Sequence, residues 1–212
     1  MKKIILLIFI LGTVCNAQIK DISRQQYFNK GDFEFTFSLN IGSSSINNKS
    51  TYRYTGSPVN NTESSYKELY FHLGAAAGYY IIDNLSVEPE LDINLSFDNS
   101  SFVVIGNLCY SFSKPASNVS PFVKIGYGWS EYKAEPYYYG GSFDSEDYKI
   151  INTGGGLKVR YSGNMMLRME INYRILSTSA SFASHEPDYS SSSKTDINIS
   201  VISFSLGIII LF

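Results

Sequence analysis

The residues best suited to acid-base or nucleophilic chemistry are the histidines, and the chain has two of them, His72 and His185. Ser184, His185 and Asp188 lie in one short segment and supply the side-chain types of a Ser-His-Asp hydrolase or acyl transferase. Serines are so frequent around them that this combination is expected by chance, and no strained nucleophile turn accompanies it. The sequence therefore predicts no catalytic residue.

The sequence gives no stronger indication of a metal or cofactor site than it gives of a catalytic site. His72 is accompanied by neither a second histidine nor a cysteine, so we expect it to be hydrogen-bonded beside Tyr70, Gly74 and Ala76 and not to ligate a metal. Glycines 154–156 lie inside a strand pattern, where close backbone approach explains them better than a phosphate-binding loop does. With 17 Lys+Arg against 19 Asp+Glu, the chain also lacks the basic excess of a nucleic-acid-binding protein.

Charged side chains form the remaining group that could act together. Five acids and five bases occupy the polar side of alternating segments: Glu34, Glu88, Glu90, Asp92, Lys124, Lys158, Arg160, Arg168, Glu170 and Arg174. Where these charges point depends on the elements that carry them.

Those elements are predicted to be β-strands. From Phe33 to Ile41 every odd residue is apolar and every even residue is polar, and successive side chains of a strand point to opposite faces. The pattern extends to eight segments, at about 33–41, 67–80, 85–97, 102–112, 121–132, 148–161, 165–175 and 197–212. Short links follow the second, fourth and sixth segments and long ones follow the first, fifth and seventh, as in a membrane-crossing meander. The fold class is therefore all-β, an eight-stranded antiparallel up-and-down transmembrane barrel.

The volume of the side chains decides which face is inside. The apolar face carries many aromatic side chains, such as Phe35, Tyr127 and Trp129, besides many Leu and Ile, and this population is too bulky for the narrow lumen of eight strands. The other face carries glycines with Ser, Thr and Asn, which leave room for the ten charged residues. We therefore expect apolar side chains to face lipid and the charges to form a neutralising network that plugs the lumen, since buried charges persist only when paired. A charged selectivity path is disfavoured because eight strands leave no continuous aqueous channel.

The amino terminus reads as a secretory signal peptide, residues 1–17. Lys2 and Lys3 precede the apolar run 4–14, and cleavage is expected after Ala17, leaving residues 18–212 as the barrel domain. Lipidation of Cys15 is disfavoured by the bulky residue before it. Cys109 then remains as a single cysteine, so an intramolecular disulfide is excluded.

Four stretches, 121–128, 154–161, 167–174 and 202–212, resemble the small outer-membrane β-barrel domain family of Gram-negative bacteria, with the general architecture of the OmpA transmembrane domain and OmpX. The resemblance covers nearly the whole mature chain and implies a location in the outer membrane. It also implies that the assembly machinery of that membrane reads a carboxy-terminal signal, carried by Phe204, Leu206, Ile208, Ile210 and Phe212.

For function, we expect a non-enzymatic barrel that contributes to surface contact, adhesion or envelope integrity. Its long loops, 42–66 and 131–147, are rich in Tyr, Ser and Gly or Asn, a composition suited to adaptable contacts. The expected partners are outer-membrane lipid, the assembly machinery and a surface ligand of unknown identity, with no nucleic acid. Three alternatives stay open: a loop-based acyl transferase or protease, a soluble exported barrel that carries an apolar ligand, and a small pore.

Overall fold

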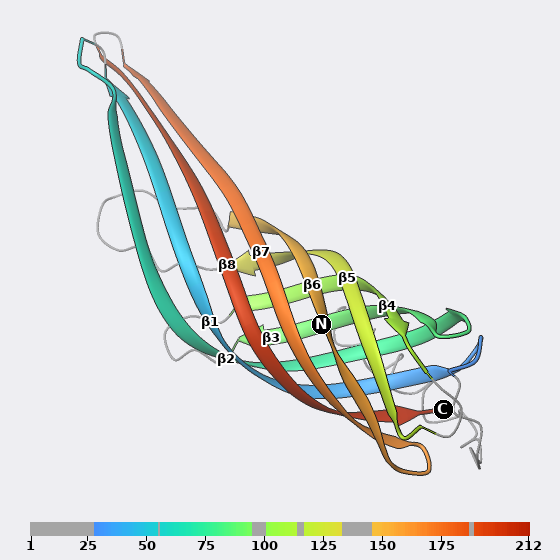
Figure 1. Ribbon diagram of the computed structural model, residues 1–212. Helices are drawn as coiled ribbons and strands as arrows, with labels where there is room; N and C mark the ends of the chain where they lie inside the picture. Colours follow the sequence, from blue (N-terminus) through green and yellow to red (C-terminus); the bar gives the residue numbers. More distant parts are fainter. Residues whose placement is uncertain (1–27, 55, 95–100, 114–116, 133–145, 187–188) are drawn as a thin grey trace.

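The computed structural model describes residues 28–54, 56–94, 101–113, 117–132, 146–186 and 189–212. Eight antiparallel strands close into a barrel in which each strand pairs with its sequence neighbours and the first pairs with the last (Figure 1). The strands are β1 (Phe33–Tyr54), β2 (Asn60–Ile82), β3 (Leu85–Asn94), β4 (Ser101–Ser111), β5 (Val119–Tyr132), β6 (Glu146–Ser162), β7 (Met165–Glu186) and β8 (Tyr189–Leu211). The predicted fold class is confirmed.

Tight connections gather at one end of the barrel, which is called the short-turn end below. Only residues 83–84 separate β2 from β3, and only residues 163–164 separate β6 from β7. Asn84 and Gly163 adopt positive φ angles of 65° and 34° there, a conformation that asparagine and glycine tolerate better than other residues. The start of β1 and the end of β8 lie at the same end of the barrel.

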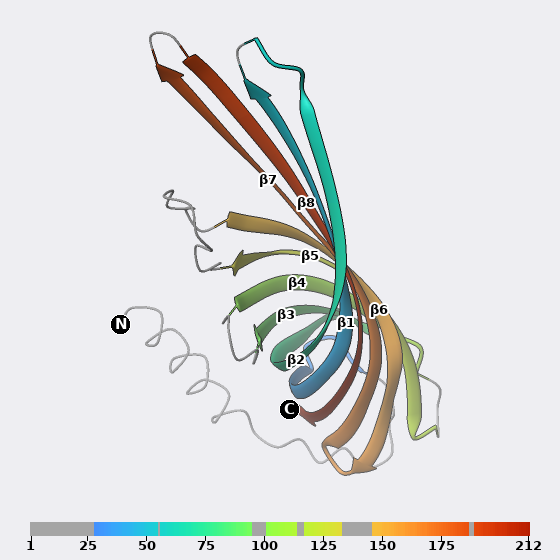
Figure 2. The same ribbon diagram turned by 90° about the vertical axis from the view of Figure 1, so that its left-hand side faces the viewer.

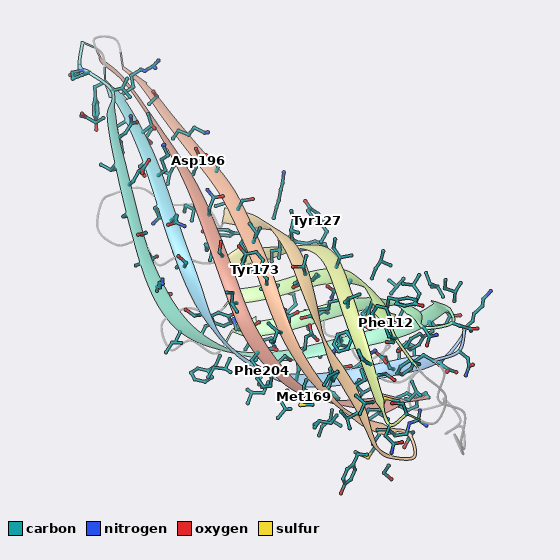
Figure 3. All side chains as sticks on the ribbon, viewed as in Figure 1. Phe112, Tyr127, Met169, Tyr173, Asp196 and Phe204 are labelled. Atoms are coloured by element: carbon teal, nitrogen blue, oxygen red, sulfur yellow. The ribbon has the colours of Figure 1, made fainter. Side chains whose placement is uncertain are left out.

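The two faces of the wall have the predicted orientation. Leu39, Ile125 and Ile208 are 54, 59 and 50% exposed on the outside, whereas Glu88 and Asp92 are at most 1% exposed inside. Figure 3 shows other outward side chains, including Tyr127, Tyr173 and Phe204, projecting away from the ribbon. A soluble carrier with an apolar lumen is therefore excluded, because its apolar face would have to point inward.

Four strands are much longer than the sequence predicts. β1 extends to residue 54 instead of 41, β2 begins at 60 instead of 67, β7 extends to 186 instead of 175, and β8 begins at 189 instead of 197. These extensions pair with one another and form a four-stranded sheet in the order β2-β1-β8-β7, which rises beyond the ends of β3 to β6 (Figures 1 and 2). We call residues 43–54, 60–69, 176–186 and 189–200 the protruding sheet.

The protruding sheet escaped prediction because both of its faces carry polar side chains. Alternation arises where one face of a strand is buried in an apolar environment, and most residues of β2 from 60 to 69 are exposed whichever way they point. The segments predicted as long loops, 42–66 and the one that carries His185, are therefore largely paired strands.

The remaining strand limits differ less from their predictions. β3 ends at Asn94, and residues 95–97 of the predicted segment lie outside the described ranges. β4, β5 and β6 begin one or two residues earlier than predicted, and β8 ends one residue before Phe212. Within the described ranges, no helix is long and apolar enough to cross a membrane.

Candidate functional site

The lumen holds a cluster of charges around Lys158 of β6, near the short-turn end. Its Nζ donates to the two carboxylate oxygens of Glu34 at 2.8 and 3.0 Å and to the Tyr80 hydroxyl at 3.1 Å. The ring centroids of Phe28, Tyr80 and Phe122 lie 5.0, 5.6 and 5.4 Å from the same nitrogen. These hydrogen bonds and cation–π contacts together offset the loss of hydration of the buried Lys158 ammonium group.

A second cluster is centred on Arg168 of β7. Its Nη1 lies 2.9 Å from Glu88 Oε2 and its Nε lies 2.7 Å from Glu170 Oε2. The guanidinium covers the ring of Phe122 at 4.5 Å, and Glu170 also pairs with Lys124. Because β3 and β7 stand on opposite sides of the barrel, the bond from Arg168 to Glu88 crosses the lumen.

A third set of contacts continues toward the protruding sheet. Glu90 accepts hydrogen bonds from Lys124 at 2.9 Å and from Arg174 at 2.6 Å. Arg174 also pairs with Asp92 at 2.5 Å, and Asn107 donates to Glu90 at 2.8 Å. The three sets share residues, so the charged interior is one connected network.

The structure brings together nine of the ten predicted network residues, namely Glu34, Glu88, Glu90, Asp92, Lys124, Lys158, Arg168, Glu170 and Arg174. Arg160 is the exception: it is half-buried at the short-turn end, and no ion pair to it occurs within the described ranges. The prediction of equal numbers is therefore wrong, since five acids face four bases. Arg160 stands opposite Met166, only two residues before the end of β6, where the charged interior gives way to an apolar layer.

That apolar layer closes the short-turn end, and the sequence did not predict it. Its members are buried Phe28, Tyr80, Met166, Ile209 and Leu211. Phe28 precedes β1 and stacks on Tyr80 with a centroid distance of 4.9 Å and an interplanar angle of 4°. Its carbonyl oxygen accepts a hydrogen bond from the Asn84 amide at 2.8 Å, which ties the cap to the β2–β3 turn. An isolated aromatic before the first strand carries no periodic signal, which is why pattern analysis missed it.

His72 lies in the upper part of the lumen, with a side chain that is 9% exposed. Its ring meets Tyr70 edge to face at a centroid distance of 4.3 Å. The expected hydrogen bonding is not complete, because His72 Nδ1 has no partner in the part of the chain that the structure describes. No group of His, Cys, Asp and Glu residues suited to a metal ion occurs in that part either.

The Ser-His-Asp combination considered above falls at the outer end of the protruding sheet. Ser184 and His185 belong to β7, where their backbones pair with Ser191 and Ser190 of β8. Their side chains and the whole of Asp188 lie outside the described part of the structure. A paired strand is also unlike the sharp turn that presents a hydrolase nucleophile.

Polar contacts between strands, and one along β8, stabilise the protruding sheet. Lys49 Nζ pairs with Glu63 across β1 and β2 at 2.9 Å, and the Glu63 carboxylate raises the pKa of Lys49. Asp196 of β8 accepts hydrogen bonds from Ser179 at 2.6 Å and from Lys194 at 3.0 Å, and these bonds lower the pKa of its carboxyl group. Contacts of this kind replace the apolar packing that holds an ordinary sheet together.

The protruding sheet also has two edges. The pairing of β2 with β3 extends outward only to His72 and Asn94, and that of β6 with β7 only to Lys149 and Ser177. Beyond these points, within the described ranges, β2 and β7 each have a strand neighbour on one side. Their outer backbone groups are therefore directed away from the sheet.

Four residues of the proposed assembly signal lie on the outward face of β8, and the fifth, Phe212, directly follows the strand. Phe204, Leu206 and Ile208 are 46, 47 and 50% exposed, whereas Ile210 and Phe212 are half-buried. Phe212 is held by two backbone hydrogen bonds with Phe33, at 2.8 and 3.3 Å, which close the seam between β8 and β1.

Comparison with known proteins places this architecture in a family. Residues 8–208 match the model of the outer membrane protein beta-barrel domain. The chain belongs to this family. It is a protein of the outer membrane of Gram-negative bacteria.

Solved structures share the fold at low sequence identity. The outer membrane protein OprG from Pseudomonas aeruginosa matches with a TM-score of 0.58 and 15% identity, over 87% of this chain and 97% of OprG. Neisserial surface protein A matches with a TM-score of 0.50 and 12% identity, over 80% of this chain and 96% of that one. No curated protein matches the sequence. At these identities the likeness extends to the fold alone.

Proposed function

We propose that this protein is a non-enzymatic outer-membrane barrel with a closed lumen, and that its protruding sheet contacts molecules or surfaces outside the cell. The difference in strand length carries the proposal. β1, β2, β7 and β8 have 22 or 23 residues, whereas β3 and β4 have 10 and 11. Because about 9–11 residues suffice to cross a bilayer as a tilted strand, the extra residues serve something other than crossing.

The surface chemistry of the protruding sheet suits contact. Tyr52, Tyr54 and Tyr66 are 37, 37 and 47% exposed among serines, threonines and asparagines. Tyrosine offers a large contact area at low cost in conformational entropy, and short polar side chains adapt their hydrogen bonds to a partner. The two free edges offer backbone groups for strand addition as well.

The filled interior of the barrel supports a function that does not use the lumen. Ion pairs cross the barrel from β6 to β1 and from β7 to β3, and an apolar layer lies below them. Eight strands enclose a space just wide enough for side chains, and here side chains occupy it. The contact surface is therefore assigned to the protruding sheet; residues 133–145 of the predicted loop 131–147 lie outside the described ranges.

A truncation variant that removes the protruding sheet and keeps the barrel tests the contact function separately from the fold. Residues 48–64 and 178–197 are each replaced by Asn-Gly, so that the pairs Asn47–Ser65 and Ser177–Asn198 flank two-residue turns. Cells that display the truncated barrel at matched levels are compared with wild type for attachment to cultured epithelial cells and to wells coated with collagen, fibronectin or laminin.

The truncated barrel is expected to fold, which heat-dependent mobility on gels would verify, and to lose most of the attachment. Lys30→Gln, at the short-turn end, is the matched control and is expected to attach like wild type. Attachment by the truncated barrel at the wild-type level would overturn the proposal.

A further inference from the structure

A glycine in the wall of the lumen brings four polar side chains around one point. Gly74 of β2 pairs with Ser38 of β1 on one side and with Asp92 of β3 on the other. A methyl group added to Gly74 would lie 2.5 Å from Asp92 Oδ1, 2.6 Å from Ser38 Oγ and 3.2 Å from Asn40 Nδ2. These side chains therefore lean over the glycine from both neighbouring strands. His72 borders them on the inner face of β2, and we call Ser38, Asn40, His72, Gly74 and Asp92 the Gly74 niche.

Three side chains of the niche have polar atoms without partners. Asn40, His72 and Asp92 are 4, 9 and 0% exposed. Within the described ranges, Asn40 Nδ2, His72 Nδ1 and Asp92 Oδ1 have no hydrogen-bond partner. Ser38 is half-buried, so its hydroxyl remains accessible from the lumen. Because a buried polar atom without a partner is destabilising, these atoms indicate that the niche binds a polar species.

The charge balance of the lumen indicates that this species is a cation. Each of the four bases of the network pairs with an acid of its own, in the pairs Glu34–Lys158, Glu88–Arg168, Glu170–Lys124 and Glu90–Arg174. Asp92 is the fifth acid, and it shares Arg174 with Glu90. The network therefore carries one negative charge in excess, and the acid without a base of its own belongs to the niche. A buried charge is costly until a counter-charge compensates it.

The inner face of the protruding sheet favours cations as well. This face continues the lumen wall outward from the niche, and it carries an acid, Glu68 of β2. The lysines and arginine of the sheet, Lys49, Arg53, Lys67 and Lys194, all stand on the outer face by the alternation of their strands. A wall with charges of one sign raises the local concentration of ions of the opposite sign.

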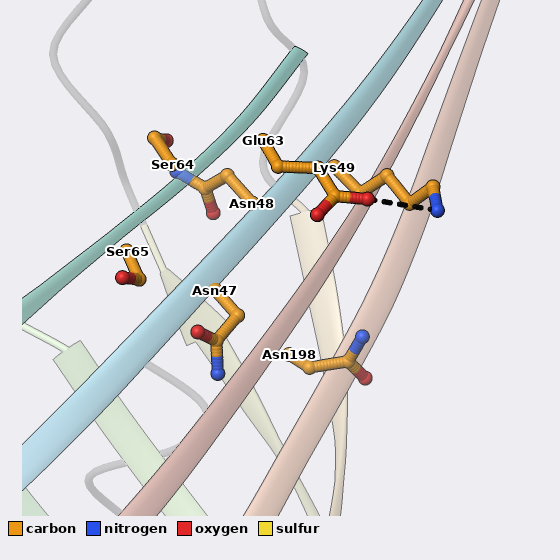
Figure 4. Close-up of a pocket in the computed structure, with 7 residues that line it drawn as sticks. All are labelled: Asn47, Asn48, Lys49, Glu63, Ser64, Ser65 and Asn198. Atoms are coloured by element: carbon orange, nitrogen blue, oxygen red, sulfur yellow. Dashed lines mark ion pairs between the residues drawn. The ribbon is translucent and has the colours of Figure 1, made fainter. Parts of the chain in front are cut away.

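A cavity on the protruding sheet differs from the niche in its charge. It has a volume of about 410 Å³ and is lined by Asn47, Asn48, Lys49, Glu63, Ser64, Ser65 and Asn198 (Figure 4). Its acid, Glu63, is paired with Lys49 at 2.9 Å, so the cavity has no excess charge. The niche instead combines a carboxylate oxygen that has no partner with an uncompensated negative charge.

We infer that the Gly74 niche binds one monovalent cation, Na⁺ or K⁺. Asp92 Oδ1 and Ser38 Oγ are ligands, and a half-turn of the Asn40 amide adds its Oδ1. Oxygen atoms of this kind are the ligands of hard cations. One positive charge balances the network, whereas a divalent ion would leave an excess positive charge.

The cation exchanges with the outside of the cell and does not cross the barrel. The rest of the charge network and the apolar cap lie between the niche and the short-turn end. The site is therefore compatible with a closed lumen, and it is independent of the proposed contact function of the protruding sheet.

Thermal unfolding of the protein in detergent micelles, followed by circular dichroism, tests the inference. Choline chloride, NaCl and KCl are compared at the same ionic strength, because the methyl groups of choline prevent direct coordination by oxygen atoms. A ligand that binds the folded state stabilises it, so the unfolding midpoint should be about 5 °C higher or more in saturating NaCl or KCl than in choline chloride. Equal midpoints of the wild type in the three salts would overturn the inference, and a pH-dependent midpoint under those conditions would assign the missing charge to a proton.

Two variants locate the ion. Asp92→Asn leaves four acids and four bases in the network and should unfold at the same temperature in all three salts. Ser38→Ala removes one oxygen ligand and should need at least fivefold more Na⁺ or K⁺ for half of the shift. A full shift in Asp92→Asn, or wild-type ion dependence in Ser38→Ala, would overturn the assignment to the niche.

Matched controls lie outside the niche. Asp196→Asn makes the same change in the protruding sheet, and Ser130→Ala removes the hydroxyl of another lumen-facing serine, on β5, which is 3% exposed. Both controls are expected to keep the wild-type shift. Loss of the shift in either control would overturn the assignment, because the effect would then not depend on the niche.

Discussion

Glu34 at the start of β1 and Lys158 near the end of β6 meet across the lumen, with Nζ and Oε1 2.8 Å apart. Their side chains are 1% and 0% exposed, and the Tyr80 hydroxyl bonds to both, donating to Glu34 at 2.8 Å. Two residues that are 124 positions apart in the chain thus fix opposite parts of the wall to each other.

Replacing Lys158 by Met leaves Glu34 buried without its main partner. Removal of one member of a buried ion pair costs roughly 3–5 kcal/mol, so the free energy of unfolding should fall by about that amount. Urea titration of the protein in lipid vesicles, followed by tryptophan fluorescence of Trp129, measures it. The double variant Glu34→Gln/Lys158→Met removes both charges and should recover much of the loss; equal stability of wild type and the single variant would contradict the pairing.

Replacing Phe28 by Ala should loosen the apolar cap. The ring is 3% exposed and stacks on Tyr80, and truncation of a buried phenylalanine costs about 3 kcal/mol or more. Cys109, which is fully buried in the lumen, reports the opening through its rate of reaction with a maleimide. The rate should rise in Phe28→Ala and stay low in Lys30→Gln, whose side chain is exposed. Equal rates in both variants would show that Phe28 does not seal the lumen.

The carboxyl group of Asp196 provides a pH-dependent contact in the protruding sheet. Hydrogen bonds from Ser179 and Lys194 lower its pKa, so the stabilisation is present above the unfolded-state pKa and is lost as the pH falls through the folded-state pKa. Ser179→Ala should raise this pKa toward its ordinary value, as measured by carboxyl-carbon NMR titration. Ser177→Ala, on the same face of β7, is the control; an unchanged Asp196 pKa in Ser179→Ala would contradict the contact.

Because side chains fill the lumen, we expect the protein not to conduct ions across a membrane. Side chains of the charge network and of the apolar cap occupy the lumen, so reconstitution into planar bilayers should give no steady conductance. Arg160→Gln, outside the network, should behave in the same way. Steady single-channel currents from wild type would favour the pore alternative.

The sequence alone predicted the membrane-crossing half of the molecule well. In segments such as 33–41, lipid on one side and a polar lumen on the other impose opposite chemistry on alternate residues, and the eight strands follow from that alternation. Nine network residues could be found for the same reason, since charges on the inner face have nowhere else to point. Arg160 was assigned to the network wrongly because alternation gives the direction of a side chain without giving its depth.

The protruding sheet and the cap could not be predicted in the same way. Residues such as Ser45, Asn47 and Lys49 face water on the outer side of a sheet whose inner side is also polar, so their sequence resembles that of a loop. Phe28 closes the lumen through one aromatic stack and a few backbone hydrogen bonds, which leave no repeating pattern. Such contacts between distant segments become visible only when the barrel has closed.

Cysteine accessibility along β8 most directly tests the claim that a closed barrel carries a sheet that protrudes from the membrane. Residues of this one strand belong to the protruding sheet, to the outward face of the barrel wall and to its lumen-facing side. Single cysteines are placed at Ser192, Lys194, Ser203, Phe204 and Ser205 in a Cys109→Ala background, and intact cells are treated with a membrane-impermeant maleimide. We expect rapid labelling at positions 192 and 194, none at 204 because it faces lipid, and none at 203 and 205 because the lumen is closed. Rapid labelling at 203 and 205, or protection at 192 and 194, would contradict a closed barrel with a sheet that protrudes from the membrane.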